Sequence, residues 1–448
     1  MSEVRETAGP RESESALRRR AVTAAMIGNA TEWYDYATYG YLAVVLGDVF
    51  FPQSQPGLSL LASYATFALA FAIRPLGAFV LGPLNDKIGR KRTLSLTILT
   101  MAAATCVIGL LPSYATAGVI APVALILARL VQGFAVGGEY GGASTFVVEY
   151  APDRRRGFWA SWLECGALGG FLLASGLTTA LTYGLSDAAM ESWGWRIPFL
   201  IALPLGTIGL YLRIRLTDTP SFRALAEEEA RPETPVKEVL TGHRARVLIC
   251  GGIVIYSSIG TYVLLTYLPS YLSEELDMAS ATAQVLVFVA GALLTAGIPF
   301  AGILSDRLGR KPLLAGAAVA YAVLAYPAFR LIQHASWGSA LAGIILLTLC
   351  HIPILGTTTA TLPALFPARV RGTGVAIGYN VSFAVFGGTA PLLMTYVVDR
   401  TGNLDVPAFY LVLVALVTLI PVSLMPETAR KPLDRPAPSP DAAERTSR

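Results

Sequence analysis

The sequence is short of charge and of cysteine. Only 14% of its 448 residues are charged and 54% are hydrophobic, whereas a soluble domain carries about 25% charged residues. Its start shows no short apolar core followed by a small-residue cleavage site, so we expect no cleaved signal peptide. The four cysteines stand at no metal-like spacing, which favours packing over redox or metal chemistry; they are Cys106, Cys165, Cys250 and Cys350. These shortages argue against a soluble enzyme and against a metal site.

The apolar residues are gathered into twelve runs of about 20 residues or more. A helix of that length crosses a hydrocarbon core of about 30 Å. We therefore predict an all-α, multi-pass membrane protein with twelve transmembrane helices. The predicted spans are Ala21–Phe50, Leu58–Pro83, Thr93–Pro112, Val119–Val148, Gly157–Tyr183, Trp195–Arg213, Val247–Leu272, Thr282–Leu304, Leu313–Ile332, Ala340–Leu365, Thr373–Val398 and Val406–Met425.

Lysine and arginine gather in every second loop between these spans. The positive-inside rule places such loops in the cytoplasm, and both termini with them. A loop predicted to lie outside, Ser273–Ala281, carries only acidic charges. The net charge of +4 reflects this bias, so it gives no argument for a nucleic-acid partner.

A polar, charge-dense stretch over residues 217–246 divides the spans into two groups of six. We predict a cytoplasmic linker there, with a short helix. The remaining predicted units are a tail over residues 1–20, a bundle over 21–216, a second bundle over 247–427 and a second tail over 428–448. Two parallel six-span repeats that hold a substrate between them near the midplane are a known transporter architecture.

Two loop motifs occur once in each half, in the same order and at nearly the same separation. Gly82–Lys91 (GPLNDKIGRK) returns as Gly302–Lys311 (GILSDRLGRK), and Pro152–Gly157 (PDRRRG) returns as Pro367–Gly372 (PARVRG). This repetition indicates an internal duplication and two pseudo-symmetric halves.

The first of these motifs predicts a gate. One glycine lets helices approach closely, the next permits a left-handed turn, and the charges between them can form contacts that break when the conformation changes. The alternative, charges that only orient the loops, explains the lysines and arginines but not the repeated aspartate and glycines. The candidate gating residues of both motifs are Gly82, Asp86, Gly89, Arg90, Arg156, Asp306, Gly309, Arg310 and Arg371.

The stretch Asp86–Arg92 resembles the signature loop of the major facilitator superfamily. Gly28–Tyr36 resembles the first-span signature of its metabolite:proton symporter branch. Three further stretches, Gln132–Tyr140, Trp193–Phe199 and Leu264–Leu272, resemble the proton-coupled proline and glycine betaine osmoprotectant transporters. The resemblance implies the major facilitator fold, alternating access, proton symport and a place in the bacterial inner membrane. Related carriers of 2-oxoglutarate, shikimate and citrate share most of the first-half motifs, so a carboxylate substrate stays open.

Ionisable side chains within spans are costly unless they are paired or face water, so each is a candidate functional residue. They gather in the first half, whereas the second half offers only His351 away from the span ends. We expect Asp35, or Glu32, to pair with Arg129, which lies at similar depth, when ionised and to release it on protonation; a static ion pair is the alternative. The candidate proton-coupling residues are Glu32, Asp35, Arg129, Glu139 and Glu164.

Glu139 and Glu164 have no evident partner in the sequence. Burial favours the neutral form of an unpaired carboxylate. That form suits a proton carrier, but it equally suits a plain hydrogen bond to a neighbouring helix.

A quaternary ammonium group cannot donate a hydrogen bond and needs aromatic faces, each of which contributes roughly 0.5–2 kcal/mol. Packing or interfacial aromatics are the alternative. We expect Arg74, near the inner end of the second span, to contact an anionic group of the substrate; extension of its side chain to the membrane interface is the alternative. The candidate substrate-binding residues are Trp33, Tyr36, Tyr39, Arg74, Trp162, Tyr262, Tyr267 and Tyr379.

We predict a proton-coupled importer of proline, glycine betaine or ectoine. The alternatives are a proton symporter of a mono-, di- or tricarboxylate and, from another class, a drug efflux pump, whose cavity would carry few charges. The glycine-rich Gly137–Gly142 lacks the Lys-Ser/Thr ending of a phosphate loop, so we expect no nucleotide or other cofactor and a proton gradient as the energy source. The expected partners are the substrate, protons and lipid. No heptads follow Glu427, so no coiled-coil regulation is expected.

Overall fold

The computed structural model describes residues 14–51, 58–214 and 233–433. All regular secondary structure in these ranges is helical. Four predicted units lie partly outside the described residues: residues 1–13 of the first tail, residues 52–57 and 215–216 of the first bundle, residues 217–232 of the linker and residues 434–448 of the second tail.

The first half runs from α1 to α10 and the second from α13 to α20, with α12 between them. The helices of the first half are α1 (Glu14–Tyr41), α2 (Ala43–Phe50), α3 (Leu58–Ala72), α4 (Arg74–Ile88), α5 (Arg90–Leu110), α6 (Tyr114–Ala117), α7 (Ile120–Tyr150), α8 (Arg156–Gly184), α9 (Asp187–Ala189) and α10 (Arg196–Ile214). After α12 (Pro235–Gly242) come α13 (Arg244–Tyr262), α14 (Leu268–Ser270), α15 (Ser280–Leu308), α16 (Arg310–Gln333), α17 (Trp337–Ala364), α18 (Arg371–Ser382), α19 (Ala390–Thr401) and α20 (Val406–Leu424).

Short π-helical turns interrupt the second-half helices that enclose the candidate site. The turn η3 (Val263–Tyr267) joins α13 to α14, and η6 (Phe383–Gly387) follows α18. Such turns inside α-helices are frequent at functional sites.

Eleven helices within the described residues are long and apolar enough to cross a membrane. The predicted first span is formed by α1 and α2 and is not among them. It carries Glu32 and Asp35 within α1, and these charges lower its mean hydropathy. The span Ala62–Ile88 places Arg74 near its middle, so the sequence-based expectation that Arg74 lies near the inner end was wrong. The helix is interrupted at this point, since α3 ends at Ala72 and α4 begins at Arg74 with a proline in its first turn.

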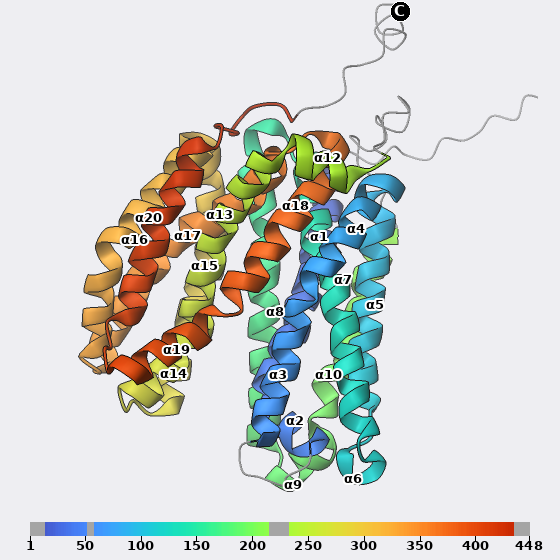
Figure 1. The fold of residues 1–448 in the computed structure, drawn as a ribbon, viewed down its shortest axis with the longest axis vertical. Helices are drawn as coiled ribbons and strands as arrows, with labels where there is room; N and C mark the ends of the chain where they lie inside the picture. The colour runs from blue at the N-terminus through green and yellow to red at the C-terminus, as the bar shows by residue number, and fades with distance from the viewer. Residues whose placement is uncertain (1–13, 52–57, 215–232, 434–448) are drawn as a thin grey trace, which may run out of the picture.

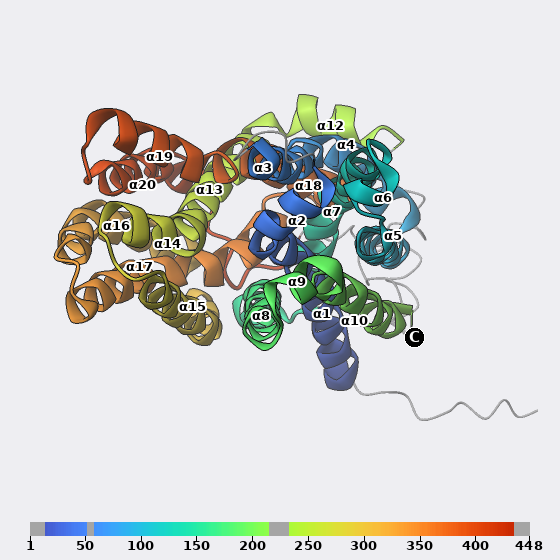
Figure 2. The ribbon, with the colours of Figure 1, turned by 90° about the horizontal axis from the view of Figure 1, so that it is seen from below.

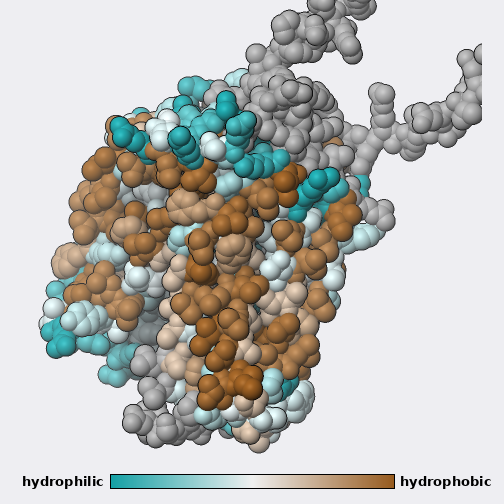
Figure 3. Space-filling view, turned by 45° about the vertical axis from the view of Figure 1, so that its right-hand side comes forward, coloured by the Kyte–Doolittle hydropathy of each residue, from teal (hydrophilic) through white to brown (hydrophobic). Residues whose placement is uncertain are grey.

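The lateral surface is apolar, as a lipid-facing surface must be. Large aliphatic and aromatic side chains stay exposed along several helices, among them Leu110, Ile120, Phe300 and Leu392. Figure 3 shows these hydrophobic side chains as a broad band, with hydrophilic residues at the α12 end and at the opposite end. This band marks the part of the molecule that lies in the hydrocarbon core.

The two halves stand side by side, as Figure 2 shows from one end. In Figure 1 their ribbons approach each other at the α12 end, and the ends that carry α14 and α19 stand away from α2 and α9. The sequence predicts that the α12 end faces the cytoplasm. In this conformation the two halves contact each other at the α12 end.

Two aspartates join the halves at the α12 end. Asp86, near the end of α4, accepts hydrogen bonds from the backbone N–H groups of Gly372 (3.1 Å) and Thr373 (2.8 Å) in the first turn of α18. Asp306, near the end of α15, accepts from the N–H groups of Gly157 (2.7 Å) and Phe158 (2.9 Å) in the first turn of α8. A helix N-terminus offers unpaired N–H groups and a partial positive charge, so each carboxylate caps a helix of the opposite half.

The glycines of the repeated motif serve this contact. Gly89 and Gly309 have φ of 106° and 107°, a region that favours glycine, and each lets the chain turn directly into the next helix. A Cβ on Gly302 would lie 2.7 Å from the Gly157 carbonyl oxygen. Only a residue without a side chain allows α15 to approach α8 so closely.

The buried arginines around the two aspartates are arranged differently. In the first copy, Glu149 Oε1 lies 3.4 Å from Arg90 Nη2 and 2.6 Å from Arg371 Nη1. In the second copy, Arg310 donates to the Ala360 carbonyl at 2.9 Å, and Arg156 forms an ion pair with Asp153. Glu149 therefore adds a second charged bridge between the halves at the first copy.

The segment after α20 lies across the second copy of the motif. Glu427 accepts from the N–H groups of Arg310 (3.0 Å) and Lys311 (3.1 Å) at the start of α16. Arg430 donates to the carbonyls of residues 306 and 307 at 2.7 and 2.8 Å. Arg156 of the first half donates to the Lys431 carbonyl at 3.0 Å. Residues 427–431 thus contact both halves.

We expect Asp306→Asn or Asp86→Asn to open the α12 end. Each substitution weakens hydrogen bonds to a charged acceptor, which are worth about 1.5–3 kcal/mol, so the equilibrium should shift about tenfold or more. Spin labels at Ile88 and Leu308, the exposed last residues of α4 and α15, report the separation by pulsed electron resonance. Asp277→Asn, at an exposed loop position, is the control. Distance distributions identical to wild type in both variants would contradict this role.

Candidate functional site

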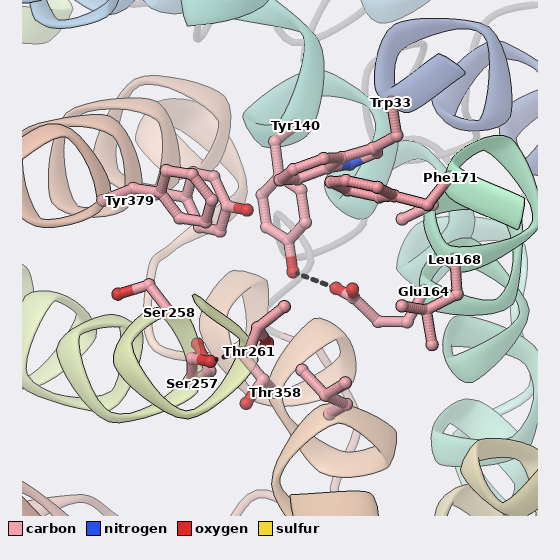
Figure 4. Close-up of a pocket in the computed structure, with 13 residues that line it drawn as sticks. Trp33, Tyr140, Glu164, Leu168, Phe171, Ser257, Ser258, Thr261, Thr358 and Tyr379 are labelled. Atoms are coloured by element: carbon pink, nitrogen blue, oxygen red, sulfur yellow. Dashed lines mark hydrogen bonds between the residues drawn. The ribbon is translucent and has the colours of Figure 1, made fainter. Parts of the chain in front are cut away.

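A cavity lies between the two halves at the level of the buried charges. It holds about 450 Å³ of space, including its open part. Trp33 on α1, Tyr140 on α7, and Glu164 and Phe171 on α8 line it from the first half (Figure 4). The second half contributes α13, α17, α18 and η6, through Ser257, Ser258, Thr261, Leu355, Thr358, Tyr379 and Phe383.

The walls of this cavity are largely aromatic. The Tyr140 and Tyr379 rings stack across the two halves with centroids 3.7 Å apart. Trp33 lies 5.3 Å from the Phe171 ring and 5.7 Å from the Phe383 ring. Aromatic faces attract cations through the ring quadrupole, so the cavity suits a positively charged group.

Glu164 is the only charged side chain among the residues that line the cavity in the described part of the chain. Its Oε1 accepts hydrogen bonds from the Tyr140 hydroxyl and the Thr359 hydroxyl, both at 2.9 Å. Tyr140 and Thr359 belong to opposite halves, so the carboxylate also links α7 and α8 to α17.

Arg74 lies behind one wall of the cavity. Its Cζ is 4.7 Å from the centre of the Phe383 ring, and its Nη2 is 3.6 Å from Glu32 Oε1. Its Nε donates to the Asn380 side-chain oxygen at 3.1 Å, and Asn380 donates in turn to the Gly137 carbonyl at 2.8 Å. Glu32 therefore pairs with Arg74, and Asn380 of the second half is bound to two first-half helices.

Asp35 and Arg129 do not form the direct ion pair that the sequence suggested. A chain of hydrogen bonds joins them instead: Arg129 donates to Gln132 at 2.9 Å, Gln132 to Thr105 at 2.5 Å, and Thr105 to Asp35 at 2.7 Å. The guanidinium Cζ lies 4.3 Å from the Tyr39 ring centre. Gln132 on α7 and Thr105 on α5 occupy the space between the two charges, which is why the charges do not touch.

Glu139 is not unpaired, contrary to the sequence-based expectation. Its Oε1 lies 2.6 Å from Arg213 Nη2, and its Oε2 accepts from the Thr97 hydroxyl. Arg213 also donates to the Leu94 carbonyl at 2.7 Å. Arg213 is the last residue of the predicted sixth span. Because α10 packs against α5, Arg213 is buried and is the ion-pair partner of Glu139.

Several expected substrate residues lie away from the cavity. Trp162 packs its ring against Phe158, 6.2 Å away, and Tyr267 packs against Tyr271 at 5.7 Å. Tyr39 donates to the Ser63 carbonyl at 3.2 Å. Tyr36 lies over both arginines, 5.6 Å from Arg74 Cζ and 5.2 Å from Arg129 Cζ, and Tyr262 packs against Phe383 at 5.7 Å. Of the candidate aromatics, Trp33 and Tyr379 line the cavity.

The sequence analysis missed some residues of this region. Tyr140 directly follows Glu139 in a motif that was recognised, and its position there was a usable signal. Gln132 opens the same recognised motif, so its position was a signal as well. Phe171 and Phe383 are two of many apolar residues of their spans, and Thr105 is a common polar residue of a span. Nothing in the sequence distinguishes these three residues, because their roles depend on how the helices are rotated.

Comparison with known proteins identifies relatives over nearly the whole chain. The model of the family described as "Sugar (and other) transporter" matches residues 21–234 and 223–437. The chain is 43% identical over 433 residues to the glycine betaine/proline/ectoine/pipecolic acid transporter OusA of Dickeya dadantii, covering 94% of this chain and 86% of that protein. It is 44% identical, with the same coverage, to the proline/betaine transporter of Escherichia coli K12.

Solved structures show the same fold. The proton:xylose symporter XylE bound to 6-bromo-6-deoxy-D-glucose matches with a TM-score of 0.79 at 16% identity, over 94% of this chain and 99% of that chain. The transporter FucP in the outward conformation matches with a TM-score of 0.64 at 15% identity, over 92% and 100% of the two chains. The predicted twelve-helix major facilitator fold is confirmed.

We expect Glu139→Gln to destabilise the protein by about 3–5 kcal/mol, because it leaves the buried Arg213 charge without its partner. The double variant Glu139→Gln with Arg213→Gln removes both charges and should recover much of the loss. Thermal unfolding in detergent measures the effect, and Glu274→Gln on the exposed surface is the control. A double variant less stable than the single one would contradict a pairing role.

Proposed function

The chain belongs to the sugar (and other) transporter family, and from this premise we propose that it is a proton-coupled symporter that imports compact zwitterions such as proline, glycine betaine or ectoine. It works by alternating access in the bacterial cytoplasmic membrane, with both termini in the cytoplasm. The placement of lysine and arginine in alternate loops supports this orientation. The names of its relatives, which are transporters of proline, betaines and ectoine, support the substrate class.

The observation that carries the proposal is the composition of the cavity. Its described lining combines one carboxylate with five aromatic rings, those of Trp33, Tyr140, Phe171, Tyr379 and Phe383, and contains no cationic side chain. A small cation gains from each ring face and from the carboxylate. A betaine or proline brings one cationic nitrogen and one carboxylate, and the cavity offers a counter-charge for the nitrogen.

A di- or tricarboxylate fits this cavity less well. It would bring two or three negative charges to a space whose lining carries a carboxylate of its own, and each unmet buried charge is costly. Arg74 and Arg129 are the cations that could serve such a substrate, but both are fully buried outside the cavity lining. The carboxylate alternative therefore requires one of them to leave its present contacts.

We assign proton coupling to the chain of hydrogen bonds between Asp35 and Arg129. Asp35 Oδ1 has no hydrogen bond within the described part of the chain, and Arg129 Nε and Nη2 have none either. The two charges therefore balance each other only through Gln132 and Thr105. Protonating Asp35 removes its charge, frees Arg129 and changes the packing of α1, α5 and α7 together, so proton and substrate can bias the same transition.

Substrate competition tests the proposed function. In proteoliposomes with an inward proton gradient, wild-type protein should accumulate labelled proline, and glycine betaine should compete for the same site. An equal concentration of 2-oxoglutarate should have little effect, because it brings two negative charges and no cationic nitrogen to a lining that itself carries a carboxylate. A protonophore provides the uncoupled control. Strong inhibition by 2-oxoglutarate with none by betaine would replace this function with the dicarboxylate alternative.

Asp35→Asn tests the coupling assignment. The variant keeps the side-chain volume but cannot lose a proton, so we expect it to lose gradient-driven accumulation and to retain downhill exchange of proline. Asp48→Asn, at an exposed position on the neighbouring helix α2, is the matched control and should accumulate proline as wild type does. Accumulation at the wild-type rate in Asp35→Asn would remove this residue from the coupling mechanism.

A further inference from the structure

Four hydroxyl groups on the second-half wall of the cavity donate to carbonyls of their own helices, away from the cavity. Ser257 donates to the Val254 carbonyl at 3.1 Å, Ser258 to the Ile255 carbonyl at 3.2 Å and Thr261 to the Ser257 carbonyl at 2.9 Å. On α17, Thr358 likewise donates to the Ile354 carbonyl at 2.7 Å. A hydroxyl has one hydrogen and two lone pairs, so all four present only acceptor lone pairs to the cavity.

His351 holds one of these hydroxyls in that state. Its Nε2 lies 2.9 Å from Thr261 Oγ1, and the Thr261 hydrogen already points to the Ser257 carbonyl. With the Thr261 hydrogen on the Ser257 carbonyl, the His351 tautomer that is protonated at Nε2 completes this contact as the donor. The histidine is fully buried, and in this tautomer it fixes Thr261 as an acceptor.

The opposite wall is also an acceptor. Both donors to Glu164, the Tyr140 and Thr359 hydroxyls, bind the same oxygen, Oε1. No described residue donates a hydrogen bond to its second oxygen, Oε2, and the carboxylate lies at the cavity opposite Ser257, Ser258 and Thr261 (Figure 4). The cavity thus has acceptor oxygens on two facing walls and aromatic rings between them.

We propose that this acceptor-lined cavity binds the positively charged nitrogen of the substrate, with Glu164 as its counter-ion. The assignment rests on the proposed function and deepens it. The negative pole of the zwitterion then points away from Glu164, towards Phe383, behind which the Arg74 guanidinium lies. Glu164 acts on the charge of the substrate, and Asp35 remains the residue that exchanges the proton.

The two substrate types should use this cavity differently. The secondary ammonium of proline carries two hydrogens and can donate to the serine and threonine oxygens. The quaternary ammonium of glycine betaine carries none, so it depends on the rings and on the Glu164 charge alone. Loss of the hydroxyl oxygens should therefore weaken proline and spare betaine.

Binding measurements on purified full-length protein, without a proton gradient, test this difference. In the double variant Ser257→Ala with Ser258→Ala, the dissociation constant for proline should rise roughly tenfold, the size expected for one hydrogen bond to a charged group. That for betaine should stay within about twofold. Ser144→Ala is the matched control, because its hydroxyl also donates to its own helix and does not line the cavity; it should leave both constants unchanged. Since both ligands bind the same preparation, a folding defect cannot change their ratio.

Glu164→Gln provides the second arm. It should weaken both substrates by about tenfold or more without altering their ratio, and Glu164→Asp should restore part of the affinity. Wild-type affinity for both substrates in Glu164→Gln would overturn the assignment, as would equal weakening of proline and betaine in the double serine variant. Failure of the wild-type protein to bind either zwitterion would instead refute the proposed function itself.

Discussion

The conformation depends on one kind of contact used twice: an aspartate of one half accepts hydrogen bonds from the first backbone N–H groups of a helix in the other half. Asp86 does this for α18 and Asp306 for α8. The acceptors are carboxylates and the donors belong to helix N-termini, so each contact is strong and depends on its distance and angle. Such contacts either form fully or separate, and they suit a molecule that must adopt two states. Everything nearer the midplane, including the cavity, is positioned by this closure.

The two halves carry similar gates but divide the chemistry unequally. The first half holds Asp35, Arg129 and the Glu139–Arg213 pair, all buried in helices that pack against one another. The second half contributes hydroxyls, aromatic rings and Asn380, which is bound to Arg74. In the proposed mechanism the proton acts within the first half, and the substrate is enclosed between both halves.

The sequence predicted features that depend on local pattern and missed those that depend on helix rotation. Runs of apolar residues predict spans, and the repeated GxLxDxxGRK pattern marks the loops that join the halves, because glycine and aspartate act within a few residues of their own position. The partner of Glu139 is 74 residues away at Arg213, and the separation of Asp35 from Arg129 is set by Gln132 and Thr105. Those relationships depend on how α5, α7 and α10 are rotated about their own axes. An apolar run does not encode this rotation, since lipid-facing and packed residues are both hydrophobic.

The segment after α20 ends on the boundary between the halves, with Glu427 and Arg430 on the second half and the Lys431 carbonyl bonded to Arg156 of the first. These residues cannot keep both attachments when that end of the molecule opens. Each opening must therefore release this segment, and each closing must bind it again. An antibody or small binding protein selective for the released segment would report transport cycles from outside the substrate path. One that bound the released segment tightly would hold the carrier open without approaching its cavity.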